Sequence, residues 1–235
     1  MIAYCANNPV NISDSNGMWW TTNSTAYYAF YAALGSAALA IAITNANIAS
    51  KNLSYNSQSK FTIPDHTING QTNEPWANMH CSTNGTISAN GCGLIAVYNY
   101  MFSKKGYKGK NLKNIIYEFD LNAAYTLVYS AAFGVNPAMF DYYFSAHGVK
   151  STTKWGLNTN SLNALAKAGG WYILTYWNDA RNHYGKGAHY VLVQYDGKTY
   201  YAYNYWSNGT APKKDAKSLS DVIGIGALIC VTVVG

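Results

Sequence analysis

The hydrophobic pattern is most regular just after Cys92, where apolar side chains recur at every third or fourth position. These positions are Leu94, Val97, Tyr98, Met101 and Phe102. This spacing places them on one face of an α-helix. Lys104 and Lys105 would complement the negative end of the helix dipole, and Gly106 is a suitable stop signal. The pattern therefore predicts a helix that begins near Cys92 and ends before Gly106.

Strand patterns dominate the second half of the chain. Residues 187–195 form an apolar run that begins close to His189, and the turn sequence Asp196-Gly197 follows it. Residues 199–205 alternate tyrosine with other side chains and complete a predicted hairpin. Two more strands are predicted, one aromatic and one rich in β-branched residues, at 171–177 and 227–233.

The segment between the Cys92 helix and these strands contains further helical patterns. We expect helices at 111–120, 137–146 and 160–167. Helices early in the chain and antiparallel strands later are typical of the α+β class. The pattern therefore predicts an α+β fold in which N-terminal helices, the Cys92 helix among them, pack on a C-terminal antiparallel sheet.

The N-terminal part differs in character from the rest. Residues 26–44 form an uncharged run that is just long enough to span a bilayer. The run is rich in alanine, however, and no lysine or arginine precedes Lys51. These features favour a packed helix over a membrane segment or a secretory signal. Residues 45–73 are polar and resemble a linker or loop. We therefore divide the chain into an N-terminal extension, 1–60, and a main domain, 61–235.

Cys92 is the first candidate for chemistry because it falls in the first turn of its predicted helix. Backbone N–H groups and the positive end of the dipole would stabilise a thiolate there and lower the cysteine pKa from about 8.5 toward neutrality. The flanking Gly91 and Gly93 would allow a substrate backbone to approach the sulfur. The alternative is a buried structural cysteine.

The predicted hairpin supplies two partners for such a nucleophile. With the turn at Asp196-Gly197, His189 and Asn204 lie near the open ends of two paired strands. A cysteine at a helix N-terminus, a histidine and an amide can act as nucleophile, base and orienting group. The alternatives are Cys81 as nucleophile, His183 as base and Asn208 as the amide. These occupy loop or turn positions, which fix a side chain less well.

Five short motifs occur in the order found in a known family. They are Trp76-Ala77-Asn78, Gly85-Thr86-Ile87, Asn90-Gly91-Cys92-Gly93, Gly187-Ala188-His189-Tyr190-Val191 and Tyr201-Ala202-Tyr203-Asn204. Together they resemble the bacterial papain-like cysteine peptidases, in the branch related to the double-glycine leader peptidases that process bacteriocins. The resemblance covers residues 61–235 and implies a papain-like fold acting on a peptide or protein substrate. It also implies that Cys92 is the nucleophile, His189 the general base and Asn204 the residue that orients the imidazole.

One position departs from the pattern of that family. Papain-like enzymes carry an oxyanion-stabilising glutamine six residues before the cysteine, and Thr86 stands there in this chain. Thr86, Ser88 and Asn90 are therefore the candidates for the oxyanion donor. A missing donor would typically cost about 2.7–4 kcal/mol of transition-state stabilisation.

The amino-acid composition limits which binding partners and which cellular location we expect for the protein. The net charge is +6, but 15 of the 16 basic residues are lysines and no basic cluster occurs, so we expect no nucleic-acid partner. Only 11% of residues are charged while 22 are tyrosines, which favours an extracellular or cell-envelope protein of a bacterium. We expect a monomer with no metal or organic cofactor, since no cysteine pair is spaced as in a zinc site. With Cys92 free, Cys5, Cys81 and Cys230 can form at most one disulfide.

Two other functions fit the same residues. A peptidoglycan amidase or endopeptidase uses a similar order of cysteine and histidine. A catalytically inactive relative that binds a surface is a second alternative, because Thr86 replaces the glutamine and the chain is rich in aromatic residues and asparagine.

Overall fold

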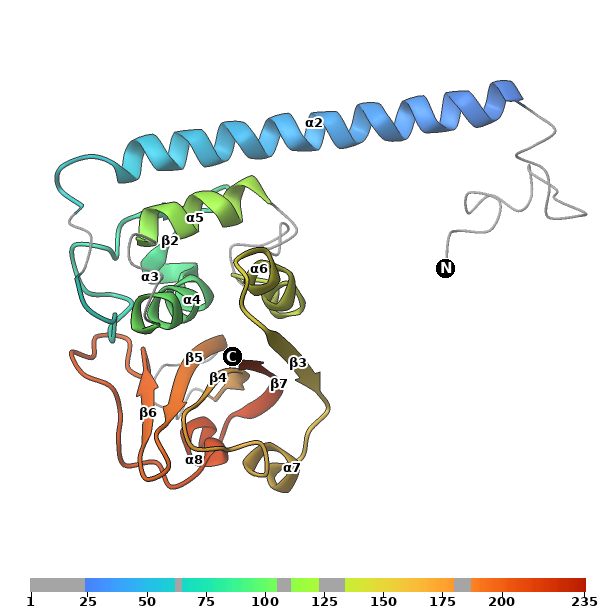
Figure 1. Cartoon of the computed structure of the whole chain (residues 1–235). Helices are drawn as coiled ribbons and strands as arrows, with labels where there is room; N and C mark the ends of the chain where they lie inside the picture. The colour runs from blue at the N-terminus through green and yellow to red at the C-terminus, as the bar shows by residue number, and fades with distance from the viewer. Residues whose placement is uncertain (1–23, 62–64, 105–110, 123–133, 180–186) are drawn as a thin grey trace, which may run out of the picture. The chain divides into compact units, whose positions relative to one another are not determined.

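A computed structural model describes residues 24–61, 65–104, 111–122, 134–179 and 187–235. Internal contacts divide the chain into two compact units, Met1–Thr44 and Asn45–Gly235. Helix α2 (Ser24–Asn56) runs from the smaller unit into the larger one (Figure 1). The candidate site lies entirely within the larger unit.

Helix α2 differs from the sequence prediction in one respect. Residues 45–56, expected within a polar linker, are helical. Asn52 and Asn56 are buried there and hydrogen bond to other parts of the larger unit, so tertiary contacts override the polar composition. In the 26–44 part, Leu39 and Ile41 are 61% and 59% exposed. No helix in the described part of the chain is both long and apolar enough to cross a membrane.

The larger unit is built on a five-stranded antiparallel sheet with strand order β3-β7-β4-β5-β6 (Figure 1). The strands are β3 (Ser151–Trp155), β4 (Gly170–Asn178), β5 (Gly187–Tyr195), β6 (Tyr200–Tyr203) and β7 (Ala227–Val234). Most of the helices precede these strands in the chain, and the combination of helices with an antiparallel sheet agrees with the predicted α+β class. The predicted strands correspond to β4, β5, β6 and β7, and β3 was not predicted.

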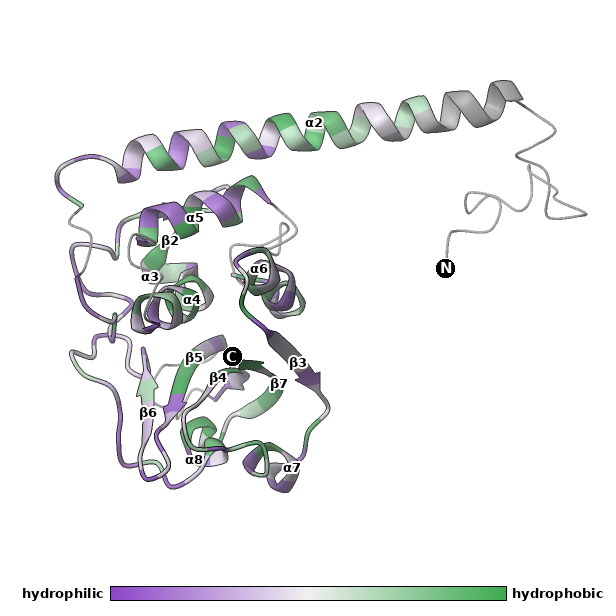
Figure 2. Ribbon diagram, viewed as in Figure 1, coloured by the Kyte–Doolittle hydropathy of each residue, from purple (hydrophilic) through white to green (hydrophobic). Residues whose placement is uncertain are grey.

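One face of the sheet is covered by the helices that precede it. These are α3 (Ile87–Asn90), α4 (Cys92–Ser103), α5 (Leu112–Leu121), the 3-10 helix η3 (Pro137–Met139) and α6 (Phe140–Ala146). The helices predicted at 92–106, 111–120 and 137–146 are thus confirmed. Asn111 caps α5 by accepting a hydrogen bond from Asn114 N. Helix α4 packs against β5, and Figure 2 shows apolar residues in both elements.

The opposite face of the sheet has its own core under two short helices. They are α7 (Thr159–Asn163) and α8 (Leu219–Ile223). Ile173 belongs to the core under α4, whereas its neighbour Leu174 belongs to the core under α8, as expected for alternation along a strand. The predicted helix 160–167 is shorter in the structure and ends at Asn163. A small separate hairpin joins β1 (His80–Cys81) to β2 (Gly85–Thr86) just before α3.

Candidate functional site

Cys92 is the first residue of α4, as the sequence predicts. Its N-cap is Gly91, and the side chain is 6% exposed. The backbone N–H groups of Tyr190, Gly93 and Cys92 itself act on the thiol and favour its deprotonated form. Tyr190 follows His189 in β5, and α4 packs against this strand, so the cysteine lies against the strand that carries the predicted base.

The two glycines beside Cys92 have a packing role. A Cβ on Gly91 would lie 2.7 Å from the Ile87 backbone of α3, and a Cβ on Gly93 would lie 2.8 Å from the Val135 side chain. Both contacts are closer than real Cβ atoms allow. These glycines are therefore explained by close packing around the start of α4, and not by substrate approach as expected from the sequence.

His189 is fully buried in β5 and its ring is held from two sides. Its Nε2 lies 3.0 Å from the backbone oxygen of Asn204. A carbonyl oxygen only accepts, so Nε2 carries the proton in this bond and Nδ1 is the basic nitrogen of the neutral ring. The Tyr176 ring on β4 meets the imidazole edge-on, with centroids 5.8 Å apart.

Asn204 lies beside His189, but it contacts the ring differently from the prediction. It is not a strand residue: β6 ends at Tyr203, and Asn204 has φ 58°. This left-handed conformation aims the backbone carbonyl at His189, whereas the side-chain Nδ2 donates to Gln71 Oε1 at 3.4 Å. The ring is thus oriented by the main chain of Asn204 and not by its amide.

Gln71 is the residue of this region that the sequence analysis missed. Its side chain is 1% exposed, and Nε2 donates to Ser88 O at 2.9 Å while Oε1 accepts from Asn204. It therefore joins the segment before α4 to the end of β6. Residues 45–73 were interpreted as a linker, and no periodicity marks Gln71 within them. Its only sequence signal is an amide side chain five residues before Trp76, whose Nε1 donates to Gly70 O.

The three predicted oxyanion candidates lie just before α4. Two of them are engaged with each other, whereas Asn90 Oδ1 is buried and has no hydrogen-bond partner among the described residues. The hydroxyls of Thr86 and Ser88 are hydrogen bonded to each other at 3.0 Å. Asn90 Oδ1 lies near Gly85, where a Cβ would approach it to 2.8 Å. Thr86 also lines a pocket of about 270 Å³ together with His80. Within the described residues, no hydrogen bond links the three candidates to Cys92 or His189.

The alternative residues are less well placed than the predicted ones. Cys81 is buried in β1, where burial and the nearby Asp120 raise its pKa. Asn208 is exposed, unlike Asn204. His183 lies outside the described residues. Cys81, Cys92 and Cys230 are all free thiols. In the described part of the chain, no group of three or more metal-binding side chains occurs.

The electrostatic environment of Cys92 differs from the expectation. Burial raises the pKa of the thiol to about 11, although the surrounding backbone N–H groups act to lower it. The thiolate predicted from the helix N-terminus is therefore wrong for the resting protein, because desolvation outweighs the helix end. A reaction at this sulfur needs a base that removes the proton, and His189, on the strand against which α4 packs, is the candidate.

Comparisons with protein-family models, with curated proteins and with solved structures find no match to this chain. The interpretation of the site consequently depends on its own geometry.

Proposed function

We propose that this protein is a cysteine hydrolase of papain-like architecture that cleaves peptide bonds. The observation that carries the proposal is the position of Cys92. Cys92 begins α4, which packs against β5. Strand β5 carries His189, whose Nε2 lies 3.0 Å from Asn204 O. This brings together a nucleophile, a base and an orienting group from three elements.

In the proposed reaction, His189 Nδ1 accepts the proton of Cys92 and the sulfur attacks the substrate carbonyl carbon. The imidazolium then gives this proton to the leaving amine, and the C–N bond breaks to leave a thioester on Cys92. Water attacks the thioester with His189 again acting as base, which releases the carboxylic acid and the free thiol. Because burial raises the pKa of the thiol, His189 has to take its proton before the sulfur can attack as thiolate.

Gln71 is the donor we assign to the oxyanion, together with the backbone N–H of Cys92. Gln71 Nε2 has two hydrogens, and only one is used by Ser88 O. Gln71 is held beside the end of β6 by buried contacts, which is the preorganisation that stabilisation of a developing charge requires. Thr86, which stands at the family position, is committed to Ser88.

The proposal is tested by incubating the folded protein with a mixture of peptides from a digested proteome and sequencing the new termini by mass spectrometry. We expect cleavage by the natural protein, none by Cys92→Ala, and retained cleavage by Cys230→Ala, which removes another buried thiol. Equal cleavage by Cys92→Ala and the natural protein would refute the proposal.

The high pKa of Cys92 favours one alternative, a binding module that has lost catalysis. Complete absence of cleavage and of thiol modification in the folded protein would support it. Release of amines from purified cell wall, but not from peptides, would instead indicate the peptidoglycan amidase.

A further inference from the structure

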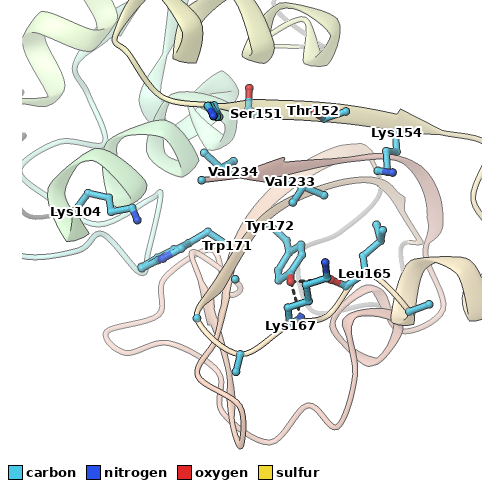
Figure 3. Close-up of a pocket in the computed structure, with 16 residues that line it drawn as sticks. Lys104, Ser151, Thr152, Lys154, Leu165, Lys167, Trp171, Tyr172, Val233 and Val234 are labelled. Carbon is cyan, nitrogen blue, oxygen red and sulfur yellow. Dashed lines mark hydrogen bonds between the residues drawn. The ribbon is translucent and has the colours of Figure 1, made fainter.

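A second recess lies at another part of the larger unit. It has a volume of about 680 Å³ and lies beside β3, β4 and β7 (Figure 3). Four lysines contribute to its wall: Lys104, Lys150, Lys154 and Lys167. No aspartate or glutamate is among its lining residues. We refer to it as the lysine pocket.

The four positive charges come from separate elements and face one recess. Figure 3 shows Lys104 at the end of α4 on one side and Lys154 on β3 on the other, with Lys167 on the loop before β4. Among the residues the structure describes, no carboxylate is paired with any of the four. Asp141, which hydrogen bonds to β3, is already engaged by Ser151 Oγ and the backbone N–H of Thr153. The pocket therefore carries a concentrated positive charge.

The wall that carries Lys167 is held in place by buried contacts. Tyr172 Oη accepts from Lys167 N at 2.8 Å and donates to Leu165 O at 2.9 Å, which fixes the loop on β4. A Cβ on Gly170 would lie 2.2 Å from that hydroxyl. Trp171 is 7% exposed and packs edge-on against Tyr100 of α4. The pocket is thus formed before any ligand arrives, which lowers the entropic cost of binding.

We propose that the lysine pocket binds a small ligand that carries two or more phosphate groups. Lysine binds phosphate oxygens as a point charge, and lysine is the only basic residue type among the residues that line the pocket. Four ammonium groups balance the charge of two phosphates, each of which carries up to two negative charges. The volume is within the range of sites for small molecules, about 300–1,000 Å³.

This site is separate from the candidate catalytic site. Trp171 lines the pocket near the start of β4, while Tyr176 of the same strand is the cross-strand partner of His189. Five residues of strand span roughly 17 Å. Binding in the pocket therefore involves neither Cys92 nor His189, and the inference does not depend on the proposed peptidase activity.

The test is isothermal titration calorimetry of the whole chain with inorganic triphosphate in about 0.15 M salt, where exposed charges are largely screened. We expect one site per chain. The double variant Lys154→Gln, Lys167→Gln should bind at least about tenfold more weakly, because each lost charge-assisted hydrogen bond is worth about a factor of ten. The matched control is Lys214→Gln, Lys217→Gln, which removes the same charge from exposed positions outside the pocket and should bind within twofold of the natural protein.

Four outcomes would overturn the proposal. They are the absence of binding by the natural protein, an equal loss in the two double variants, equal affinity for citrate, and tighter binding of a single-stranded oligonucleotide than of triphosphate. The variant Lys154→Arg, Lys167→Arg keeps the charge and should retain binding. Loss of binding in this variant with the fold intact by circular dichroism would contradict a site based on the charges of these two side chains.

Discussion

At the scale of single residues, the proposed reaction depends on how Cys92 loses its proton. Helix position alone favours a thiolate, and this is what the sequence predicts. In the structure the Cys92 thiol is almost completely buried, and this burial raises its pKa to about 11. The two effects oppose each other at one sulfur, and desolvation is the larger. The sequence shows where a helix begins, but it does not show how deeply the first turn is buried.

This balance leads to a prediction about pH. Alkylation of Cys92 by iodoacetamide should accelerate by about tenfold per pH unit between pH 7 and pH 10, because only the thiolate reacts and its fraction grows below a pKa of about 11. Mass spectrometry of the labelled Cys92 peptide against pH gives the profile. A rate that is already constant below pH 7 would instead indicate a thiolate in the resting protein.

Asn204 supports a second prediction at this scale. Because its backbone carbonyl orients His189 and its φ is 58°, Asn204→Gly should keep the conformation and retain most of the turnover. Asn204→Ala should be less stable by about 1 kcal/mol and should turn over more slowly, because alanine disfavours this conformation. Both variants lack the amide. Equal loss of kcat in the two would therefore show that the amide, and not the carbonyl, orients the ring.

At the scale of elements, the buried carboxylate of Asp120 links the end of α2 to the rest of the larger unit by hydrogen bonds. Asp120 on α5 accepts hydrogen bonds from Asn52 Nδ2 of α2 and from Ser82 N after β1, each at 2.7 Å. Burial raises the pKa of Asp120 to about 6, even though these two hydrogen bonds lower it. The group therefore holds a proton more tightly in the folded protein than in the unfolded chain.

The raised pKa of Asp120 predicts how stability changes with pH. Its contribution is fully present below about pH 4 and is lost as pH rises through about 6, because the folded state favours the protonated form. Between pH 7.5 and pH 5 this gain is about 1 kcal/mol. Urea unfolding at both pH values should show this gain in the free energy of unfolding for the natural protein and not for Asp120→Asn. An identical pH dependence in both proteins would contradict the assignment.

The elements also differ in how well the sequence predicts them. Helices α4 and α5 have a regular apolar period and α5 also has a capping asparagine, so both could be located from local pattern alone. The segment 45–56 could not, because Asn52 and Asn56 become helical through buried hydrogen bonds to distant residues. Strand β3 was missed because it is short and polar, with an exposed lysine and tryptophan, so neither alternation nor apolarity marks it.

At the scale of the whole molecule, both sites combine residues that lie far apart in the sequence. The places of Cys92 and His189 in the fold could be predicted because each lies near the beginning of a regular element. Gln71 could not, since its position depends on a loop held between α4 and the segment after β6, through Asn99 and Ser207. The lysine pocket was not visible either, because its four lysines form a cluster only in the folded chain.

The contribution of Gln71 can be separated from that of Thr86. If Gln71 donates to the oxyanion, Gln71→Ala should lower kcat by about 10²–10³-fold with a smaller change in KM. Thr86→Val, which removes the hydroxyl from the family position, should change kcat little. Steady-state kinetics on one peptide substrate compare the two variants. A large loss of kcat in Thr86→Val with little change in Gln71→Ala would instead assign the oxyanion donor to Thr86.

The central claim is that Cys92 and His189 form one reactive pair. The most direct measurement is covalent labelling of the folded protein by a peptidyl acyloxymethyl ketone at neutral pH, with the modified cysteine identified by mass spectrometry. We predict labelling of Cys92 in preference to Cys81 and Cys230, and labelling at least about tenfold slower in His189→Ala, since general-base assistance is worth about 10²–10⁴-fold. No labelling of Cys92 in the natural protein, or an equal rate in the folded His189→Ala variant, would contradict the claim.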